Sequence, residues 1–269
     1  MKRNHSIQPK LLEKPWGRAN LSPDLVGNCE GPVGEIWFQP DAPLGSILTK
    51  YLFTSAKLSV QVHPRAELSP TGRGKDECWL IIDAEPGAML ATGFRENIAT
   101  DAIREAALDG SIEHLLDWRE VAVNDFLYVP AGTVHAMGPG LTLVEVQQST
   151  DITYRLYDYG RDRPLHLEEA LQSAIGTSHP GELRRNIDPA STQVLVEGPW
   201  FSVAQIANGD LDNVVGLFAG AVQVIPLDGP CSLDGIAVPM GSSAQVGGLS
   251  EVDFADCRRC LVAGLPVRA

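Results

Sequence analysis

One short segment has a polar face that could do chemistry. Side chains alternate between two faces along residues 58–63 (LSVQVH), so Ser59, Gln61 and His63 share one face and apolar residues the other. Such a polar face either meets solvent or lines a polar cavity inside a barrel. In a cavity, the imidazole and the amide oxygen would be available to a metal ion.

Two further segments favour the cavity. Glu77 begins the apolar run ECWLIID, and a carboxylate directed into a barrel needs a metal ion or another cation as its partner. In VPAGTVHA, Pro130 and Gly132 predict a tight turn that returns the chain to a strand at His135. Two imidazoles, a carboxylate and an amide oxygen together suit Zn²⁺, Mn²⁺ or Fe²⁺.

The elements that must position these residues are mostly short strands. Segments rich in β-formers, separated by glycine or proline, predict strands at 44–53, 58–63, 77–83, 125–129, 141–147 and 152–157. Helices are predicted at 101–108 with Thr100 as N-cap, at 111–118 and at 167–174. Short strands return at 201–206, 214–218 and 222–225. We therefore predict a mainly β sandwich or barrel.

The chain resembles the type I, short bacterial mannose-6-phosphate isomerases of the cupin superfamily. Residues 130–135 match the second cupin motif, although Asn124 stands where that motif starts with glycine. In the first motif, Gln61-Val62-His63 replaces the usual HxH, and the acidic residue, Glu77, lies well downstream. Supporting blocks follow in family order at 13–17 (EKPWG), 34–37 (GEIW), 48–50 (LTK), 75–82 and 143–158.

The resemblance implies a cupin (jelly-roll) fold with a small helical insertion and a second, smaller β lobe. The metal-binding lobe is expected over residues 1–185, with its helical segment at about 100–118, and the C-terminal lobe over 190–269. The boundary is predicted at 188–192 (DPAST), which is polar and rich in breakers. The C-terminal lobe contains no histidine, so we expect no equivalent metal site there.

The resemblance also implies roles, carried over by position. The metal ligands would be Gln61, His63, Glu77 and His135, holding Zn²⁺ or another divalent metal. Lys50, Ser59 and Glu145 would bind the substrate, and Lys75 and Arg155 would be catalytic.

Cations near the substrate also make physical sense, because an acidic protein needs local positive charge to bind a phosphate. Arginine can hold phosphate through two hydrogen bonds. The alternative for Arg155 is an internal ion pair with Asp151 or Asp158. Arg65 stands where the family commonly has an acidic residue, so the rim at 68–74 and the sugar preference are open.

The implied activity is the interconversion of mannose 6-phosphate and fructose 6-phosphate through an enediol. The base is open among Glu145, Lys75 and a metal-bound water. Alternatives are isomerisation of another phosphorylated sugar, a metallocupin that binds sugar phosphates without turnover, and the cupin domain of sugar-nucleotide transferases. The retention of four ligand positions with Lys75 and Arg155 argues against a non-catalytic role.

Composition limits the partners and the compartment. The net charge of −13 argues against non-specific binding to nucleic acid or anionic membranes. Residues 1–10 carry no signal-peptide pattern and apolar stretches are short, so we expect a soluble cytoplasmic protein, monomeric or homodimeric.

The other cysteines and histidines are interpreted as structural. The five cysteines, at positions 29, 78, 231, 257 and 260, form no disulfide framework, and the CxxC spacing at 257–260 is interpreted as incidental. The remaining histidines are interpreted as surface, helix or loop residues: His5, His114, His166 and His179.

Overall fold

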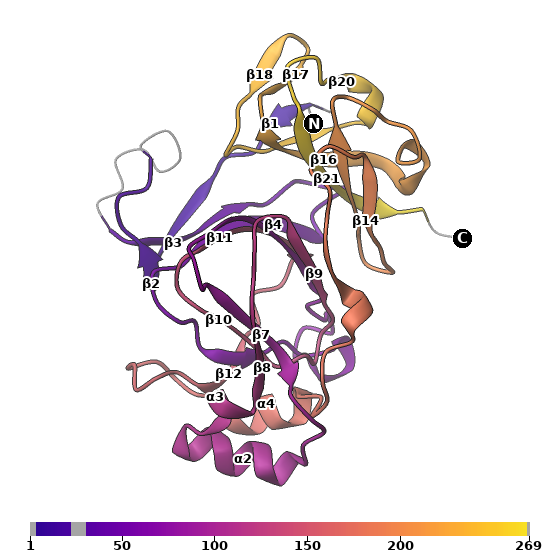
Figure 1. Ribbon diagram of the computed structural model, residues 1–269. Coiled ribbons are helices and arrows are strands. Elements are labelled where there is room, and N and C mark those ends of the chain that lie inside the picture. Colours follow the sequence, from indigo (N-terminus) through magenta and orange to yellow (C-terminus); the bar gives the residue numbers. More distant parts are fainter. Residues whose placement is uncertain (1–3, 23–30, 268–269) are drawn as a thin grey trace.

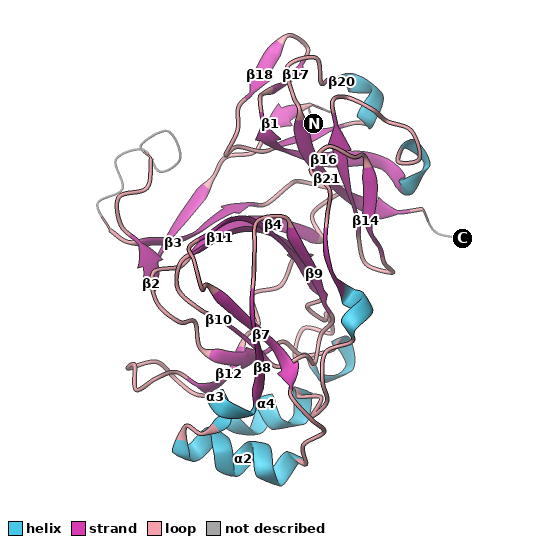
Figure 2. Ribbon diagram, viewed as in Figure 1, coloured by secondary structure: helices cyan, strands magenta, loops and turns pink. Residues whose placement is uncertain are grey.

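The computed structural model describes residues 4–22 and 31–267, so Cys29 lies outside the described residues. Two β-rich lobes pack against each other, and a layer of helices covers the far side of the first lobe (Figures 1 and 2). The prediction of a mainly β protein is confirmed. No helix in the described part of the chain is long and apolar enough to cross a membrane.

Two antiparallel sheets form the first lobe. The larger sheet has the strand order β13-β9-β6-β11-β4-β3-β2, with the bounds Arg184–Asn186, Asp125–Val129, Glu77–Ala84, Leu141–Gln148, Ile47–Phe53, Val33–Phe38 and Lys10–Arg18. The smaller sheet has the order β12-β5-β10-β7-β8, with the bounds Tyr154–Tyr157, Val60–Val62, His135–Met137, Met89–Phe94 and Leu116–Glu120. Face-to-face antiparallel sheets of this kind are typical of jelly rolls.

Three helices cover the outer face of the smaller sheet (Figure 2): α2 (Thr100–Asp109), α3 (Ile112–Leu115) and α4 (Leu167–Ser173). Two helix predictions need correction. The N-cap of α2 is Ala99, and Thr100 is already helical. The helix predicted at 111–118 ends at Leu115, because Leu116 begins β8 and pairs with Phe94 of β7. Sheet pairing therefore overrides a local pattern that favours helix.

A six-stranded sheet forms the core of the second lobe. Its strand order is β1-β19-β16-β21-β15-β14, with the bounds His5–Ser6, Ala244–Val246, Phe218–Asp228, Arg259–Pro266, Ser202–Ala207 and Gln193–Glu197. A small sheet, β18-β17-β20 (Ile236–Val238, Cys231–Leu233, Val252–Asp253), flanks it. The strand predicted at 214–218 is wrong: Val215–Leu217 is a 3₁₀ turn, closed by a hydrogen bond from Leu217 N to Val214 O, and β16 starts at Phe218.

The two lobes share a hydrophobic core. Phe38, Tyr51 and Leu80, on the outer face of the seven-stranded sheet, cluster with Val203 and Leu261 of the second lobe. Between β13 and β14 the chain leaves the first set of sheets for the second. A domain boundary at 188–192 stays a prediction.

Candidate functional site

Strand β5 directs a polar row into the interior of the first lobe. Val60 and Val62 belong to the apolar cluster beneath the helices, so Gln61 and its neighbours Ser59 and His63 project the opposite way. Ser59 and His63 are each only 2% exposed. The polar face therefore belongs to the interior of the sandwich and not to the solvent.

Neighbouring strands bring the other two candidate ligands to the same place. On β6, Cys78 packs toward the second lobe, so Glu77 faces the interior. On β10, His135 pairs in register with Gln61 of β5. The ligand atoms of His63, Glu77 and His135 all lie within 4.8 Å of one another, and all three residues are buried.

Backbone carbonyls orient both imidazoles. His63 Nδ1 lies 2.9 Å from Ile152 O, and His135 Nδ1 lies 3.0 Å from Thr133 O. Each Nδ1–H donates to its carbonyl, so each Nε2 offers a lone pair to the centre. Burial lowers the pKa of His135 to about 3, and Glu77 opposes this shift only in part. His135 is therefore neutral at pH 7, as a metal ligand must be.

The carboxylate of Glu77 has the environment of a metal ligand. Both of its oxygens are buried, and neither accepts a hydrogen bond of good geometry from the described residues. Burial acts to raise its pKa, but the charges of Lys75 and His63 outweigh burial and hold the pKa well below its usual range. A buried ionised carboxylate between two imidazoles suits a divalent cation.

Gln61 is placed to complete the ligand set. Its Nε2 lies 3.2 Å from His135 Nε2, and its Oε1 accepts a hydrogen bond from Ser59 Oγ at 2.9 Å. A half-turn of the amide exchanges these two atoms and presents Oε1 beside His135, where it could coordinate. Ser59 can then accept from the amide nitrogen, so its hydroxyl can bind the amide of Gln61 in either orientation.

A polar cavity of about 300 Å³ opens onto this cluster. Lys50, Lys75, Glu145 and Arg155 line it together with Gln61, Glu77 and His135. Ser59 is not among its lining residues, so its predicted role in binding substrate stays a prediction. The structure therefore places seven of the site residues expected from the sequence around one cavity.

A buried ion pair forms part of the cavity wall. Lys50 Nζ lies 2.9 Å from Glu145 Oε1, and Trp79 Nε1 donates to Glu145 Oε2 at 3.2 Å. Burial acts to lower the pKa of Lys50, but Glu145 and then Glu35 outweigh burial and raise it. Lys50 therefore stays an ammonium and cannot serve as a base.

This pair gives a stability prediction. Glu145→Gln should lower the free energy of unfolding by roughly 3 kcal/mol, because it leaves the buried Lys50 ammonium without its carboxylate. Urea denaturation measures the change. Adding Lys50→Met should recover most of the loss, and Glu168→Gln in the exposed Arg104–Glu168 pair should change nothing measurable. Equal stability of Glu145→Gln and wild type would contradict the prediction.

Among the described residues, the guanidinium of Arg155 forms no ion pair. The alternative of an internal pair is not what the structure shows: Asp158 pairs with Arg161 and Arg163, and no carboxylate of the described residues lies within 4.0 Å of Arg155. Its Nε is buried without a hydrogen-bond partner. A half-buried guanidinium with an unused donor beside a cavity is suited to an anionic ligand.

Known proteins are similar to this chain in sequence and in fold, although no protein-family model matches it. Mannose-6-phosphate isomerase of Streptococcus mutans is 40% identical over 170 residues, which are 58% of this chain and 53% of that protein. ManA of Bacillus subtilis, also named a mannose-6-phosphate isomerase, is 38% identical over 59% of this chain and 54% of its own length. The match thus spans little more than half of these two relatives.

YvyI of Bacillus subtilis, provisionally named a mannose-6-phosphate isomerase, is 33% identical over 244 residues, which are 73% of this chain and 77% of YvyI. The chain belongs to the mannose-6-phosphate isomerase family.

Solved structures support the fold. A Bacillus subtilis mannose 6-phosphate isomerase matches 98% of this chain with a TM-score of 0.74 at 23% identity. A zinc-bound mannose 6-phosphate isomerase matches 98% with a TM-score of 0.72 at 13% identity. The cupin-type expectation is confirmed.

In this family member, sequence reasoning missed several residues of the cavity wall. The most informative are Arg163 and His166, which line the cavity although His166 was interpreted as a loop residue. Lys14, Trp16 and Glu35 also line it. Lys14 and Trp16 lie in the EKPWG block and Glu35 lies in GEIW, so the family resemblance could have indicated all three. No local pattern distinguished Arg163 or His166.

The other histidines and Arg65 lie away from the cavity of this family member. Arg65 pairs with Glu67 at 3.2 Å, and His179 Nε2 lies 2.8 Å from Tyr128 O. His114 is exposed on α3, and His5 lies beside Asp41.

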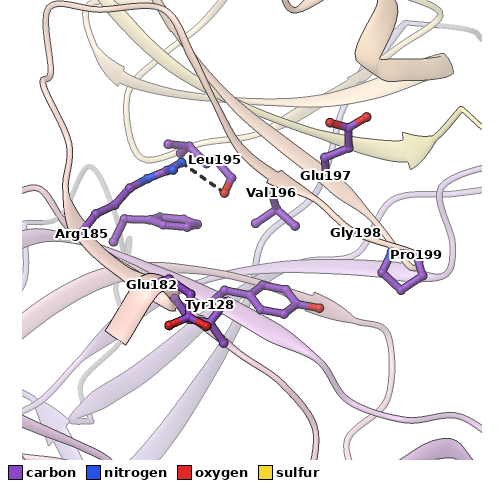
Figure 3. Close-up of a pocket in the computed structure, with 10 residues that line it drawn as sticks. Tyr128, Glu182, Arg185, Leu195, Val196, Glu197, Gly198 and Pro199 are labelled. Carbon is purple, nitrogen blue, oxygen red and sulfur yellow. Dashed lines mark hydrogen bonds between the residues drawn. The ribbon is translucent and has the colours of Figure 1, made fainter. Parts of the chain in front are cut away.

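A second cavity of about 300 Å³ lies between β9, β13 and β14 (Figure 3). Its walls are mainly apolar, and Arg185, whose Nη2 donates to Leu195 O at 3.3 Å, points across it. None of its lining residues belongs to the possible metal-ligand cluster of the described residues, His63, Glu77 and His135. The cavity beside His135 is therefore the candidate active site of this family member.

Proposed function

We propose that this protein interconverts mannose 6-phosphate and fructose 6-phosphate with a divalent metal, Zn²⁺ in the first instance. The observation that carries the proposal is one cavity that joins a three-residue metal cluster to an unpaired arginine. The names of the relatives support the substrate, and the zinc-bound family structure supports the ion. We place the reaction in the cytoplasm, and the protein as a monomer or homodimer without a nucleic-acid partner.

Gln61, His63, Glu77 and His135 would hold the metal. When bound, Zn²⁺ supplies a Lewis acid that stabilises negative charge on substrate oxygens during enolisation. The imidazoles are oriented by their carbonyl partners, and Glu77 is ionised in the cluster.

The remaining polar residues would bind and orient the open-chain sugar. Lys75 Nζ lies 2.9 Å from His63 Nε2 and 3.0 Å from Glu77 Oε2, so its positive charge is directed at the place where an oxyanion would develop. Glu145, fixed by Lys50 and Trp79, can accept hydrogen bonds from sugar hydroxyls. Glu145 and Lys75 both line the cavity, and either could move the proton between C1 and C2.

A coupled assay tests the proposal. Purified protein should convert mannose 6-phosphate to fructose 6-phosphate, lose this activity with EDTA and regain it with zinc, with metal content measured on the same sample. A folded, zinc-loaded protein that leaves mannose 6-phosphate unchanged would overturn the proposal. Turnover of a different phosphorylated aldose in a substrate panel would then identify another isomerase of the same type.

A further inference from the structure

The cationic side chains that line the cavity fall into two groups, and in only one group does the positive charge exceed the negative charge of the carboxylates beside it. Lys14 lies 3.5 Å from Glu35, Lys50 lies 2.9 Å from Glu145 and Lys75 lies 3.0 Å from Glu77, so buried carboxylates already balance the three lysines. Arg155 lies on a different part of the wall and has no carboxylate within 4.0 Å among the described residues. An anionic ligand is therefore drawn to the arginine side of the cavity and not to the lysines.

A second arginine adds to this excess charge. Asp158, whose side chain is 1% exposed, accepts hydrogen bonds from Arg163 Nε and Nη2 at 2.6 and 2.5 Å and from Arg161 Nη1 at 3.0 Å. One carboxylate thus serves two guanidinium groups. Arg161 turns away from the cavity and donates to Lys57 O, whereas Arg163 lines the cavity.

Arg155 and Arg163 influence each other. Burial first, and then the positive charge of Arg163, lower the pKa of Arg155. Asp151 is the other acidic group on this part of the wall, and it is exposed, so water and salt screen its charge. Two guanidinium groups close enough to interact, with too little negative charge between them, are suited to a dianion.

His166 supplies a neutral donor at the same place. Its backbone N donates to Arg155 O at 2.9 Å, and its Nδ1 accepts from Arg155 N at 3.3 Å. Because Nδ1 accepts a hydrogen bond from an amide, the neutral ring carries its proton on Nε2. His166 lines the cavity, so this Nε2–H is the ring edge that remains for a ligand.

We propose that Arg163 and His166, together with Arg155, form the phosphate subsite of the cavity. The two guanidinium groups would hold the phosphate oxygens, and His166 Nε2 would donate to one of them. These three residues are less buried than Glu77 and His135, so the phosphate would bind nearer the solvent and the reacting carbons nearer the metal cluster. The sugar named in this assignment rests on the proposed function, but the anion subsite does not.

Calorimetric titration of the metal-loaded protein with fructose 6-phosphate, with fructose and with inorganic phosphate tests the subsite. Arg163→Met and His166→Asn should each weaken fructose 6-phosphate binding roughly tenfold or more, since each removes a hydrogen bond to a charged group. Any affinity for fructose should stay unchanged. Arg161→Met is the matched control, because it removes a guanidinium from the same Asp158 but outside the cavity, and it should change affinity less than about twofold.

The outcomes separate this proposal from the proposed function. Affinity that depends on Arg163 and His166, in a protein without isomerase activity, would support the subsite and overturn the isomerase. Full turnover with unchanged fructose 6-phosphate affinity in Arg163→Met and His166→Asn would overturn the subsite and leave the isomerase standing. A loss in Arg161→Met equal to that in Arg163→Met would also overturn the subsite, because the effect would then be structural.

Discussion

Glu77→Gln and His135→Ala proteins are expected to be purified without zinc and without isomerase activity. His135→Ala removes one of three buried ligand groups whose atoms lie within 4.8 Å of one another, and Glu77→Gln replaces the charged carboxylate of another with a neutral amide. Loss of a residue that merely orients a ligand costs about 10–100-fold in metal affinity, so loss of a ligand should cost more. Zinc content by elemental analysis, measured on the same samples as turnover, gives the result.

His114→Ala is the control for this prediction, because His114 is an exposed histidine on α3. It should keep both zinc and activity. Thermal unfolding of all variants shows whether they remain folded. Stoichiometric zinc in His135→Ala would mean that the metal binds elsewhere in the protein, and stoichiometric zinc in Glu77→Gln would mean that the charge of Glu77 is not needed to hold it.

Lys75→Met is expected to keep zinc and lose activity. The ammonium of Lys75 lies beside His63 and Glu77, where it can stabilise an oxyanion or transfer a proton, and methionine has a similar length but no charge. Removing one such group typically costs about 10²–10³ in kcat. Steady-state kinetics on zinc-replete protein should therefore show a much lower kcat.

Lys10→Met offers a matched comparison, since Lys10 is exposed on β2 and its ammonium only overlies Trp37. Its kinetic constants should equal those of wild type. A Lys75→Met protein with wild-type kcat would remove Lys75 from the chemistry and leave Glu145 or a metal-bound water as the base.

The grouping of His63, Glu77 and His135 could be predicted in part from local alternation and in part from the family resemblance. Ser59, Gln61 and His63 share a face in any strand, and the turn before His135 returns the chain to the sheet. The cations of the cavity were partly predictable, through blocks such as LTK that resemble the family. Arg163 and His166 were not, because they enter the cavity through the path of the segment between β12 and α4.

The helix predicted at 111–118 is wrong at its end for the same reason. Residues 116–118 continue a helix-like pattern, yet they pair with β7, a segment more than twenty positions earlier. Likewise, a strand of two residues such as β1 has no periodicity to recognise, and only its partner β19 defines it. Pairing between segments that are distant in the sequence determines β8 and β1. Such pairing cannot be predicted from the local sequence pattern alone.

The pairing of β1 with β19 also constrains the order of assembly. His5 lies opposite Gln245, and β1 lies within the C-terminal lobe in Figure 1. On the ribosome, β1 is made well before β19, so it must wait for its partner until the intervening strands have emerged. Such a high contact order slows folding, and an unpaired edge of β19 is open to other chains until β1 arrives. One edge of the six-stranded sheet is therefore formed by a strand that is made long before the rest of that sheet.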